Sequence, residues 1–493
     1  DKKIERFLNR WAQKKEKHVV RPNKRIELLR DQITKPKESN IINESELVEV
    51  IKTPINYKTD VLVVGGGPAG LSAAIASARA GSETMIIERH GCFGGVITTV
   101  GMETLGWYRY EGTVDSEGIG REFERIAERM GATVKWPYND SPCLDADHFK
   151  IIADKLLLDN NVKPLLHTTA VEAIVESIDS NKVIKGVIIE NKSGRQAVLA
   201  QRVIDCTGDA DIAYLSGCRF TKMPLDISLG VTNVFNMSGV NKKKFLEYTE
   251  KNPQYYKDWS NSWEQLSSGK EDNLRSPYLH KEFNSSKPAN SNTSFDGSWS
   301  GLTEAGEATN LNIVHMKNID PTNAEDVTKA EMTGRQETMT AIKAMKDNIP
   351  GFENAKLRNF SMTLGTRDSR KIVGRYNLTG FDVCKEARFE DSIGIFPEFV
   401  DGYNILLLPT SGRYFQVPYG CLVPDVDNLL VAGRCVAGDT ISHAATRNMM
   451  CCTVTGQGAG VSAAISIKTN KSTRNVKISM VQQELIRQGV KLK

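Results

Sequence analysis

The sequence predicts an α/β fold: a Rossmann-like nucleotide-binding domain with a parallel sheet and an antiparallel meander, into which an α+β substrate domain is inserted. Two observations support this prediction. A short apolar run followed by closely spaced glycines occurs near residue 60, and a similar arrangement returns only after residue 427. Between them, continuous apolar runs typical of buried parallel strands give way to the alternation typical of antiparallel strands.

The first nucleotide-binding signature lies within residues 60–88. An apolar run of strand length at 61–64 leads into the spacing G-x-G-x-x-G, and an alanine-rich helix is expected next. The glycines permit a tight turn, close approach of a pyrophosphate to the backbone, and close packing of helix on strand. The residues expected at the phosphates are Gly65, Gly67, Pro68, Ala69 and Gly70. Glu88 ends the next strand, where its carboxylate can accept hydrogen bonds from a ribose 2′-hydroxyl.

More glycines follow in the segment 89–102. Because glycine lets a ligand approach the backbone closely, this segment is also expected to meet the dinucleotide. Its candidate contacts are Arg89, Gly94, Gly95 and Val96. Helices are then predicted at about 116–130, from an apolar face, and at about 145–160, where Asp145 is a suitable N-cap.

Residues 162–206 carry the alternating pattern. The expected meander strands are 165–167, 170–175, 183–190 and 197–199. A separate short strand at 202–206 is expected to rejoin the parallel sheet and to end in T-G-D-A-D. A glycine and an acid at a strand end indicate another close approach of backbone to ligand, at Thr207, Gly208 and Asp209.

The region 219–427 is less regular. An Asn/Ser-rich segment at 283–300 is expected to be a surface loop, and a helix is predicted at about 323–346. Three tryptophans are interpreted as packing or subunit contacts: Trp259, Trp263 and Trp299. The block 363–376 brings four cations close together: Arg367, Arg370, Lys371 and Arg375.

Strand and glycine signals return in the last third. A buried strand is expected at 428–432, followed by G-R-C-V-A-G-D at 433–439. The run T-G-Q-G-A-G at 455–460 is interpreted as a glycine-rich helix start, whose free N–H groups would attract an anion or a carbonyl oxygen.

These signals divide the chain into five parts. A basic helical arm (1–57) precedes the first part of the nucleotide-binding domain (58–218). The substrate domain (219–427) separates it from the second part (428–470), and a C-terminal helix (471–493) follows. The arm is expected to pack on its own or on a partner subunit, and we expect a homo-oligomer.

Composition restricts the possible functions. A net charge of +4 on 493 residues, with no basic stripe, argues against nucleic-acid binding. No apolar run approaches the ~20 residues that span a bilayer. Nine cysteines without a C-x-x-C pair argue against an iron–sulfur or zinc site, so no metal is expected. Scattered thiols of this kind point to a cytoplasmic protein.

Four segments in this order resemble one family: G-G-G-P-A-G with its Glu88, T-G-D-A-D, R-D-S-R-K-I-V-G, and L-L-V-A-G-R-C with G-Q-G-A-G. Together they resemble the FAD-dependent oxidoreductases of the glutathione-reductase-like group, with its FAD-binding fold. The branch that fits includes relatives of the flavin subunit of heterodisulfide reductase and, more remotely, soluble fumarate reductases. The resemblance covers about residues 58–490.

The resemblance implies FAD as the cofactor and assigns contacts to it. The first glycines would hold the pyrophosphate, and Glu88 the adenosine ribose. The backbone of Val171 would meet the adenine, with Gly208 and Asp209 near the adenosine half. In the second glycine-rich turn, Gly433 would also bind the cofactor, and Gly438 and Asp439 would meet the ribityl chain or pyrophosphate. A helix opened by Gln457, Gly458 and Ala459 would point its positive end at the isoalloxazine, which favours reduced flavin.

The resemblance and the residues together predict an oxidoreductase that moves a hydride or electron pair between FAD and a small organic substrate. The candidate catalytic residues are His443, Arg370, Arg367, Arg447 and Tyr419. A histidine suits acid–base chemistry, although His443 could instead orient flavin or backbone. Arg370 could grip a substrate carboxylate or form a salt bridge between domains. The arginines favour an anionic or carbonyl-bearing substrate.

Other functions stay open at this point. An electron-transfer subunit would need cluster-binding cysteines or a tightly bound partner. A redox-neutral hydratase, isomerase or lyase, and a flavin monooxygenase, are further alternatives. The glycine cluster at 456–460 lies where this fold binds flavin, so no dedicated NAD(P)H domain is expected.

Overall fold

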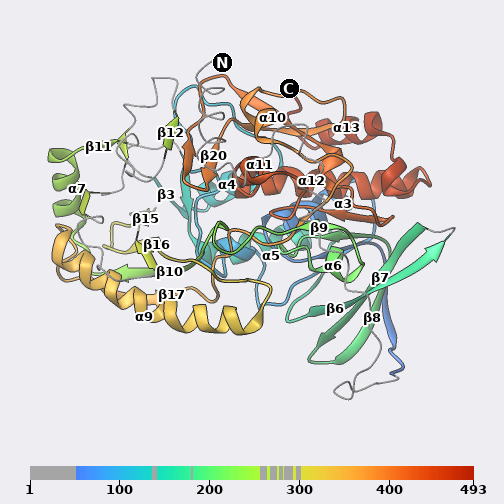
Figure 1. Cartoon of the computed structure of the whole chain (residues 1–493), viewed down its shortest axis with the longest axis horizontal. Helices are drawn as coiled ribbons and strands as arrows, with labels where there is room; N and C mark the ends of the chain where they lie inside the picture. The colour runs from blue at the N-terminus through green and yellow to red at the C-terminus, as the bar shows by residue number, and fades with distance from the viewer. Residues whose placement is uncertain are drawn as a thin grey trace.

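The computed structural model describes residues 51–135, 141–178, 181–255 and 301–493, with the short segments 264–266, 275–276, 281–282 and 293–295. Several predictions therefore lie outside the described residues: the arm up to residue 50, most of the Asn/Ser-rich segment, and Trp259, Trp263 and Trp299. Figure 1 shows the meander and the helices of the nucleotide-binding part on the right, and the inserted antiparallel sheet on the left.

A parallel sheet forms the centre of the nucleotide-binding part. Its order is β5 (Lys163–Leu165), β2 (Thr84–Ile87), β1 (Ile55–Val64) and β8 (Gly194–Asp205), with β23 (Leu429–Val431) beside the last residues of β8. Val64 pairs with Ile87 on one side and with Asp205 on the other, so these strands end at one common edge. β1 begins inside the segment predicted as arm, because its first residues also pair with β8.

The antiparallel meander consists of β6 (Thr169–Ile178), β7 (Asn181–Asn191) and the first half of β8. The prediction of separate strands at 197–199 and 202–206 is wrong, because β8 is continuous over 12 residues. Its first half pairs with β7 and its last residues with β23, so one strand serves both the meander and the parallel sheet.

Helix α12 (Met449–Lys468) packs closely along α3 (Pro68–Arg79). Gly456 and Gly460 face α3, and a Cβ on either would lie 2.1 Å from a carbonyl oxygen of that helix. These glycines therefore allow close helix packing. The prediction that they open a helix is wrong, because α12 begins after its N-cap Asn448.

Among the described residues, α12 is the one helix long and apolar enough to cross a membrane, and nearly all of it is buried inside the fold. The other predicted helices are present as α4 (Ile119–Arg129), α5 (Ala146–Asp159), α9 (Ala324–Asn348) and α13 (Ile478–Arg487). The carboxylate of Asp145 caps α5 by accepting the N–H of His148 at 2.8 Å, as the sequence predicts.

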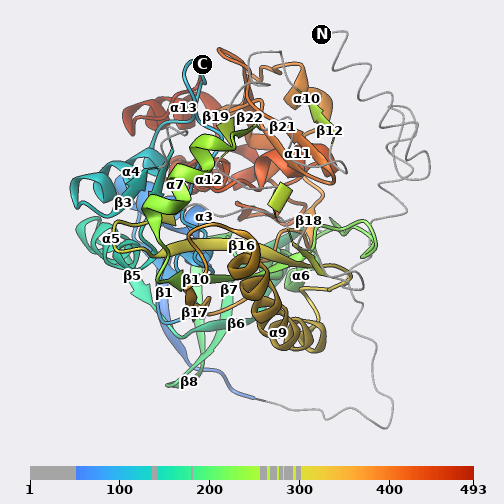
Figure 2. The same cartoon turned by 90° about the vertical axis from the view of Figure 1, so that its left-hand side faces the viewer.

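The inserted region builds a second, antiparallel sheet. Its order is β14 (Thr293–Phe295), β16 (Ala308–Met316), β10 (Val231–Ser238) and β17 (Lys356–Phe360), with β15 (Gly301–Leu302) also on β16. Helix α9 packs on β16 and β10, as Figure 2 shows. Thr232 of β10 pairs with His315 of β16 and bridges to Gly365, which ties this sheet to the basic block.

The remaining elements are η2 (Gly95–Ile97), β3 (Thr133–Lys135), β4 (Pro142–Leu144), α6 (Asp211–Leu215), β9 (Phe220–Thr221), α7 (Lys242–Lys251), β11 (Gln254–Tyr255), β12 (Glu264–Leu266), β13 (Arg275–Ser276), β18 (Lys371–Ile372), α10 (Gly380–Cys384), β19 (Ser392–Pro397), β20 (Val400–Gly402), β21 (Ile405–Leu407), β22 (Tyr414–Pro418), η5 (Tyr419–Leu422), α11 (Thr440–Thr446) and η6 (Thr473–Asn475). One apolar core joins the parallel sheet to the inserted sheet. The predicted fold class is confirmed, and the predicted domain boundaries stay predictions.

Candidate active site

A cavity of about 360 Å³ lies at the carboxyl edge of the parallel sheet and extends to the inserted sheet. Residues just after β1, β2, β8 and β23 line one end, and residues of β10 and β16 line the other. Ligands of α/β folds bind at the carboxyl ends of parallel strands, and this volume lies in the usual range for ligand pockets. The cavity therefore joins the predicted nucleotide turns to the inserted region.

The turn after β1 leaves room for phosphate groups. Gly65 has a left-handed φ of 102°, and a Cβ on it would lie 2.4 Å from the carbonyl oxygen of Cys206. Gly67 is the N-cap of α3, and no side chain caps the first helical amides, which also lack an acceptor within the helix. Gly95 packs directly against this turn, since a Cβ on it would lie 2.6 Å from the Gly67 Cα. This cradle suits a pyrophosphate.

Two other predicted glycines shape the cradle without lining it. A Cβ on Gly70 would lie 1.8 Å from the carbonyl oxygen of Gly65, so its role is close packing. The amide of Gly94 donates to the carbonyl of Gly66 at 2.8 Å, which holds the second loop against the first. The predicted residues beside them line the cavity: Pro68, Ala69 and Val96.

Glu88 is buried at the end of β2, and backbone amides hold both of its carboxylate oxygens. Oε2 accepts from the amide of Gly66 at 2.7 Å, and Oε1 accepts from the amide of His90 at 2.9 Å. The carboxylate is thereby fixed at the cavity, where a ribose acceptor is predicted, and Arg89 lines the same end. Val171 does not line the cavity. The residues directly before it do: Thr168, Thr169 and Ala170.

Two carboxylates organise the turn after β8. Asp205 accepts from the amide and the hydroxyl of Thr207 at 3.0 and 2.7 Å, and burial raises the pKa of Asp205 to about 6. Asp209 accepts from the Ser369 hydroxyl at 2.6 Å and from Arg434 at 2.8 Å. Burial opposes the ionisation of Asp209, but Arg434 and Ser369 outweigh it and lower the pKa of Asp209. The predicted residues of this turn line the cavity: Thr207, Gly208 and Asp209.

After β23 the cavity is lined by Gly433, which the sequence predicts, and by Arg434, which it does not. Gly438 and Asp439 lie further along, at the start of α11, and do not line the cavity. The Asp439 carboxylate accepts from the amides of Ser442 at 2.9 Å and Gly380 at 3.0 Å. Its implied contact with the ribityl chain or pyrophosphate is not supported, because Asp439 acts as a helix cap.

The amino-terminal end of α12 lines the cavity, not its glycine-rich middle. The lining residues are Asn448, Met449 and Cys452. The residues implied to open this helix are buried within it: Gln457, Gly458 and Ala459. The side-chain oxygen of Gln457 accepts the amide of Ile119 at 3.0 Å and so caps α4 instead. Any effect of the α12 helix dipole on a ligand therefore comes from its amino-terminal end, at Asn448.

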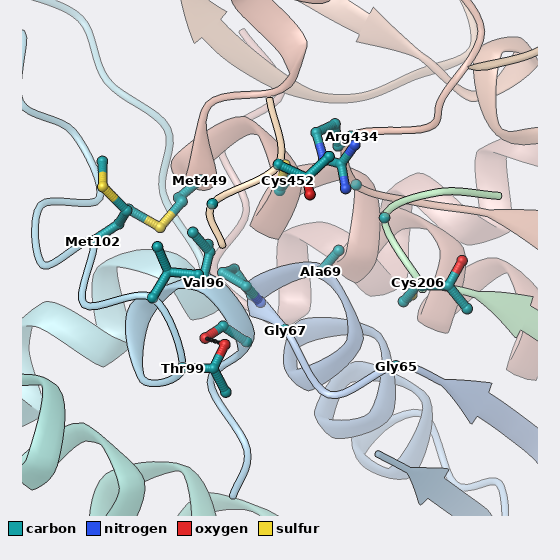
Figure 3. A pocket seen from close by; sticks show the side chains of 18 of the residues that line it. Gly65, Gly67, Ala69, Val96, Thr99, Met102, Cys206, Arg434, Met449 and Cys452 are labelled. Atoms are coloured by element: carbon teal, nitrogen blue, oxygen red, sulfur yellow. Dashed lines mark hydrogen bonds between the residues drawn. The ribbon is translucent and has the colours of Figure 1, made fainter. Parts of the chain in front are cut away.

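The other end of the cavity combines an apolar wall with polar strand residues. Figure 3 shows the side chains of Met102, Met449 and Val96 on one side, next to the start of α3. Leu105 and Trp107 extend this wall. The polar residues come from the inserted sheet and the block after it: Thr232, Asn310, Asn312, His315, Thr366 and Arg367.

Arg367 and Arg447 are the predicted catalytic residues that line the cavity. Arg367 Nη1 lies 2.9 Å from His315 Nδ1, and His315 Nε2 lies 2.9 Å from the carbonyl oxygen of Asn312. Since an arginine only donates and a carbonyl only accepts, these two contacts match the tautomer with its proton on Nε2. The guanidinium of Arg447 binds the carboxylate of Asp401 at 2.8 Å.

His443 lies behind the cavity wall, contrary to the acid–base prediction. It is almost fully buried, and its Nε2 lies 3.1 Å from the carbonyl oxygen of Arg367. Burial, with the nearby charge of Lys371, lowers the pKa of His443 to about 3. The imidazole is therefore neutral and orients the backbone, which is the alternative that the sequence left open.

Arg370 and Tyr419 also do not line the cavity. Arg370 binds Asp211 at 2.8 Å and lies 4.3 Å from the centre of the Tyr214 ring, so it forms the predicted alternative, a salt bridge between the two parts. The Tyr419 hydroxyl is buried and donates to the carbonyl of Thr473 at 2.7 Å. Both side chains stabilise the fold around the site.

A comparison with known families decides the class of protein. The family described as FAD dependent oxidoreductase matches residues 60–485, which is most of the chain. The chain belongs to this family. FAD is therefore its cofactor, and the protein is an FAD-dependent oxidoreductase.

Curated relatives of this oxidoreductase are distant. The tRNA uridine 5-carboxymethylaminomethyl modification enzyme of Granulibacter bethesdensis is 28% identical over 174 residues, which are 30% of this chain and 24% of that enzyme. The thiamine thiazole synthase of Archaeoglobus fulgidus is 28% identical over 204 residues, or 39% of this chain and 72% of the synthase. Because the chain spans only about a quarter of the first relative's length, its own substrate is a matter for proposal.

Among solved structures, a geranylgeranyl bacteriochlorophyll reductase-like protein from Thermoplasma acidophilum is 16% identical, with a TM-score of 0.44 over 87% of this chain and 82% of that one. The p-nitrophenol 4-monooxygenase of Pseudomonas putida is 11% identical, with a TM-score of 0.41 over 88% and 85%.

The residues of the cavity fit FAD. Gly95 packs on Gly67 with no room for a Cβ on Gly95, and the uncapped amides of α3 stand beside this contact. These groups would hold the pyrophosphate, and Glu88 the adenosine ribose. The part of the apolar wall next to the start of α3, at Val96 and Met449, suits the flat flavin ring. The signal for Arg434 in the sequence is its place shortly after a parallel strand. Asn310 and Asn312 stand out because they alternate with apolar residues in β16.

Proposed function

We propose that the protein moves a hydride or an electron pair between FAD and a small organic substrate that carries a carboxylate or carbonyl group. FAD supplies the redox chemistry when bound, by accepting or donating two electrons. The observation that carries the proposal is the single cavity, which runs from the nucleotide cradle to the polar residues of the inserted sheet.

The charges that line the inserted-sheet end support an anionic substrate. They are Arg367, Arg447 and Asp401, and they sum to one positive charge. Arg447 and Asp401 bind each other, and the Arg367 guanidinium lies 2.9 Å from His315 Nδ1. A guanidinium in a partly dry cavity can grip a carboxylate through two hydrogen bonds, or stabilise negative charge on a carbonyl oxygen.

The apolar wall has a separate role in this proposal. Met102, Leu105 and Trp107 face the cavity with few polar atoms, so they would exclude water from the reacting groups. Trp107 packs edge-to-face on Phe399 with ring centres 4.9 Å apart, which restricts its movement. The substrate is therefore expected to have an apolar body beside its polar group.

The finer family branch, near heterodisulfide reductase flavin subunits and fumarate reductases, belongs to this proposal and rests on the order of the four sequence segments. A cluster-bearing electron-transfer subunit is less well supported. All nine cysteines are buried thiols, and no metal-binding group of side chains occurs among the described residues. The absence of a dedicated NAD(P)H domain, the homo-oligomer and the cytoplasmic location stay predictions.

Anaerobic mixing tests the proposed direction of electron flow. The FAD-loaded protein is mixed with NADH, with NADPH, and with a panel of 2-hydroxy acids and 2-amino acids, while the flavin absorbance is followed. Rapid bleaching by one organic acid and slow or no bleaching by either nicotinamide is the expected result. Rapid bleaching by NADH or NADPH alone would contradict it. Turnover of a substrate with no flavin bleaching would favour the redox-neutral alternative.

A further inference from the structure

The outer face of α9 carries two exposed methionines. The inner face of this helix packs on β10 and β16, and Figure 1 shows α9 at the edge of the molecule. On the outer face, Met332 and Met339 are 58% and 53% exposed. Apolar side chains are stabilised by removal from water, so two of them on one helix face, two turns apart, form a candidate contact surface.

These methionines belong to a column of four residues at seven-residue spacing: Glu325, Met332, Met339 and Lys346. Seven residues complete almost two turns of an α-helix, so the four side chains follow one face and drift by only ~20° at each step. A second helix can follow such a column by winding gently around the first, as in a two-stranded coiled coil. The column therefore offers a seam along most of this 25-residue helix.

The surface of α9 is hollowed beside Met332. A shallow groove there is lined by Lys329, Met332, Thr333 and Gln336, among other residues of the same helix. These four have the spacing i, i+3, i+4 and i+7, so they are neighbours on the helix surface. Four such neighbours form the hole that receives one side chain of a facing helix. The groove therefore has the geometry of a helix-packing site.

Opposite charges stand at the two ends of the column. Glu325 lies in the first turn of α9 and Lys346 in the last, and neither side chain has an ion-pair partner among the described residues. By contrast, Lys343 of the same helix binds Asp347 at its own i+4 position. The column therefore carries one unpaired negative end and one unpaired positive end, with methionines between them.

This order of residues is complementary to itself when reversed. The pair Met332 and Met339 and the pair Glu325 and Lys346 share one midpoint on the helix, between residues 335 and 336. Two antiparallel copies that cross at this midpoint place Met332 of each copy opposite Met339 of the other. The same register places Glu325 of each copy opposite Lys346 of the other, so both ends of the seam gain an attractive pair.

We propose that a second copy of this chain docks on the outer face of α9, with the two helices antiparallel about a two-fold axis between residues 335 and 336. Such a contact uses the same surface on both copies, so it closes as a dimer and leaves no free site for further growth. Because the contact is only one helix wide, we expect a weak dimer with a dissociation constant of about 10 µM.

The dimer would support the wall of the substrate cavity without adding a residue to it. The inner face of α9 packs on the strands that carry Thr232 and Asn312, and both of these residues line the cavity. A Cβ on Gly334 of α9 would lie 2.9 Å from the Asn233 Cβ, so the helix backbone lies directly on the sheet. Docking needs neither electron transfer nor substrate and is therefore independent of the proposed function.

Sedimentation velocity of the FAD-loaded full chain, at concentrations from about 1 to 100 µM, tests for the dimer. We expect the wild type to become dimeric over this range and Met332→Lys to weaken the dimer at least about tenfold, because it places a charge in the seam. Leu158→Lys is the matched control, since Leu158 of α5 is 63% exposed and lies on another face. It should dimerise as the wild type does. A monomeric wild type at the highest concentration, or wild-type dimerisation of Met332→Lys, would overturn the proposal.

Exchange of the two end charges tests the antiparallel register. Glu325→Lys and Lys346→Glu each place like charges at both ends of the seam, and each should weaken the dimer by about 3- to 10-fold. The double variant restores opposite charges at both ends and should bind within about threefold of wild type. If the double variant shows the summed loss of the two single variants, the ends do not meet in this way and the register is wrong.

Disulfide trapping locates the centre of the contact. Met332→Cys and Met339→Cys place their new thiols opposite each other only when the two variants are mixed. Within either variant alone the two copies of the thiol are about 10 Å apart along the helix axis, which is beyond the reach of a disulfide. All nine native cysteines are buried and should not compete. We expect a crosslinked dimer in the oxidised mixture and none in the separate variants. A crosslink in either variant alone, or none in the mixture, would contradict this packing.

Discussion

The carboxylate of Asp209 and the guanidinium of Arg434 lie 2.8 Å apart, although 225 residues separate them in the chain. Asp209 follows β8 and Arg434 follows β23, the two adjacent strands that end at the cavity. Ser369, from the basic block, donates to the same carboxylate and accepts from the same arginine. Three distant segments of sequence thus meet in one buried cluster beside the FAD cradle.

Removal of one partner of this pair is expected to cost more than removal of both. Arg434→Met leaves the Asp209 carboxylate buried without its cation, which should destabilise the protein by about 3–5 kcal/mol. Asp209→Asn together with Arg434→Met removes both charges and should recover most of that loss. Denaturant unfolding of the four proteins measures the coupling. If the effects of the two substitutions on the free energy of unfolding are additive, Asp209 and Arg434 do not stabilise each other.

The FAD cradle predicts different outcomes for two glycines with similar backbone conformations. Gly95 and Gly131 have left-handed φ values of 52° and 68°. A Cβ on Gly95 would lie 2.6 Å from the Gly67 Cα, whereas a Cβ on Gly131 would meet nothing within 4 Å. Backbone strain should cost both alanine variants about 1 kcal/mol of stability. Gly95→Ala should lose more, because its Cβ meets the backbone of Gly67, and only Gly95→Ala should lose bound FAD. The ratio of flavin to protein absorbance after purification measures this. Equal FAD content in the two variants would contradict the cradle.

Substitution of Glu88 is expected to lower the affinity for FAD without unfolding the protein. Glu88→Gln replaces one of the two oxygens held by the amides of Gly66 and His90 with an NH2 group, which cannot accept. FAD should bind about 10- to 100-fold more weakly, because a charge-assisted hydrogen bond contributes roughly 1.5–3 kcal/mol. Equilibrium dialysis of the apoprotein against FAD measures the change. Glu83→Gln, on the exposed turn before β2, is the control and should not change it.

The buried carboxyl group of Glu103 is expected to make the stability of the protein fall as the pH rises. Burial raises the pKa of Glu103 from its ordinary value of 4.5 to about 7, although Thr309 and Cys143 donate to its carboxylate. Between these values the folded protein binds more protons than the unfolded chain. The stabilisation is therefore fully present below pH 4.5 and is lost as the pH rises through 7, a change of about 3 kcal/mol.

The comparison that isolates this effect is with Glu103→Gln, which cannot titrate. The melting temperature of the wild type should fall relative to that of the variant as the pH rises from 4.5 to 7.5. Other groups, His443 included, titrate in both proteins and cancel in the difference. If the melting temperatures of wild type and Glu103→Gln change by the same amount over this pH range, the pKa of Glu103 is not raised.

The first nucleotide unit could be predicted because its local signals agree with one another. The strand before Gly65, the spacing to Gly70 and the acid at Glu88 each specify one part of the same turn. Thr207 to Asp209 and Gly433 were found for the same reason, since each follows a parallel strand directly. The order of the strands in the parallel sheet is enough to bring these residues close to one another.

The rest depends on contacts that sequence spacing does not encode. Gly456 and Gly460 have the spacing of a phosphate loop, yet they pack on α3, because small residues also let two helices approach closely. His443 has the chemistry of an acid–base residue, but burial removes it from the cavity. His315 is brought to Arg367 by the pairing of β16 with β10, which joins segments far apart in the chain.

The measurement that tests the central claim most directly is a crystal structure of the FAD-loaded protein with a bound organic acid that bleaches the flavin. The central claim is that one cavity holds FAD at the nucleotide cradle and the organic substrate at the inserted-sheet end. We predict the adenosine ribose at Glu88 and the carboxylate of the acid within hydrogen-bonding distance of the Arg367 guanidinium. An acid bound elsewhere, or FAD that fills the cavity as far as His315 and leaves no room for a second molecule, would contradict the account.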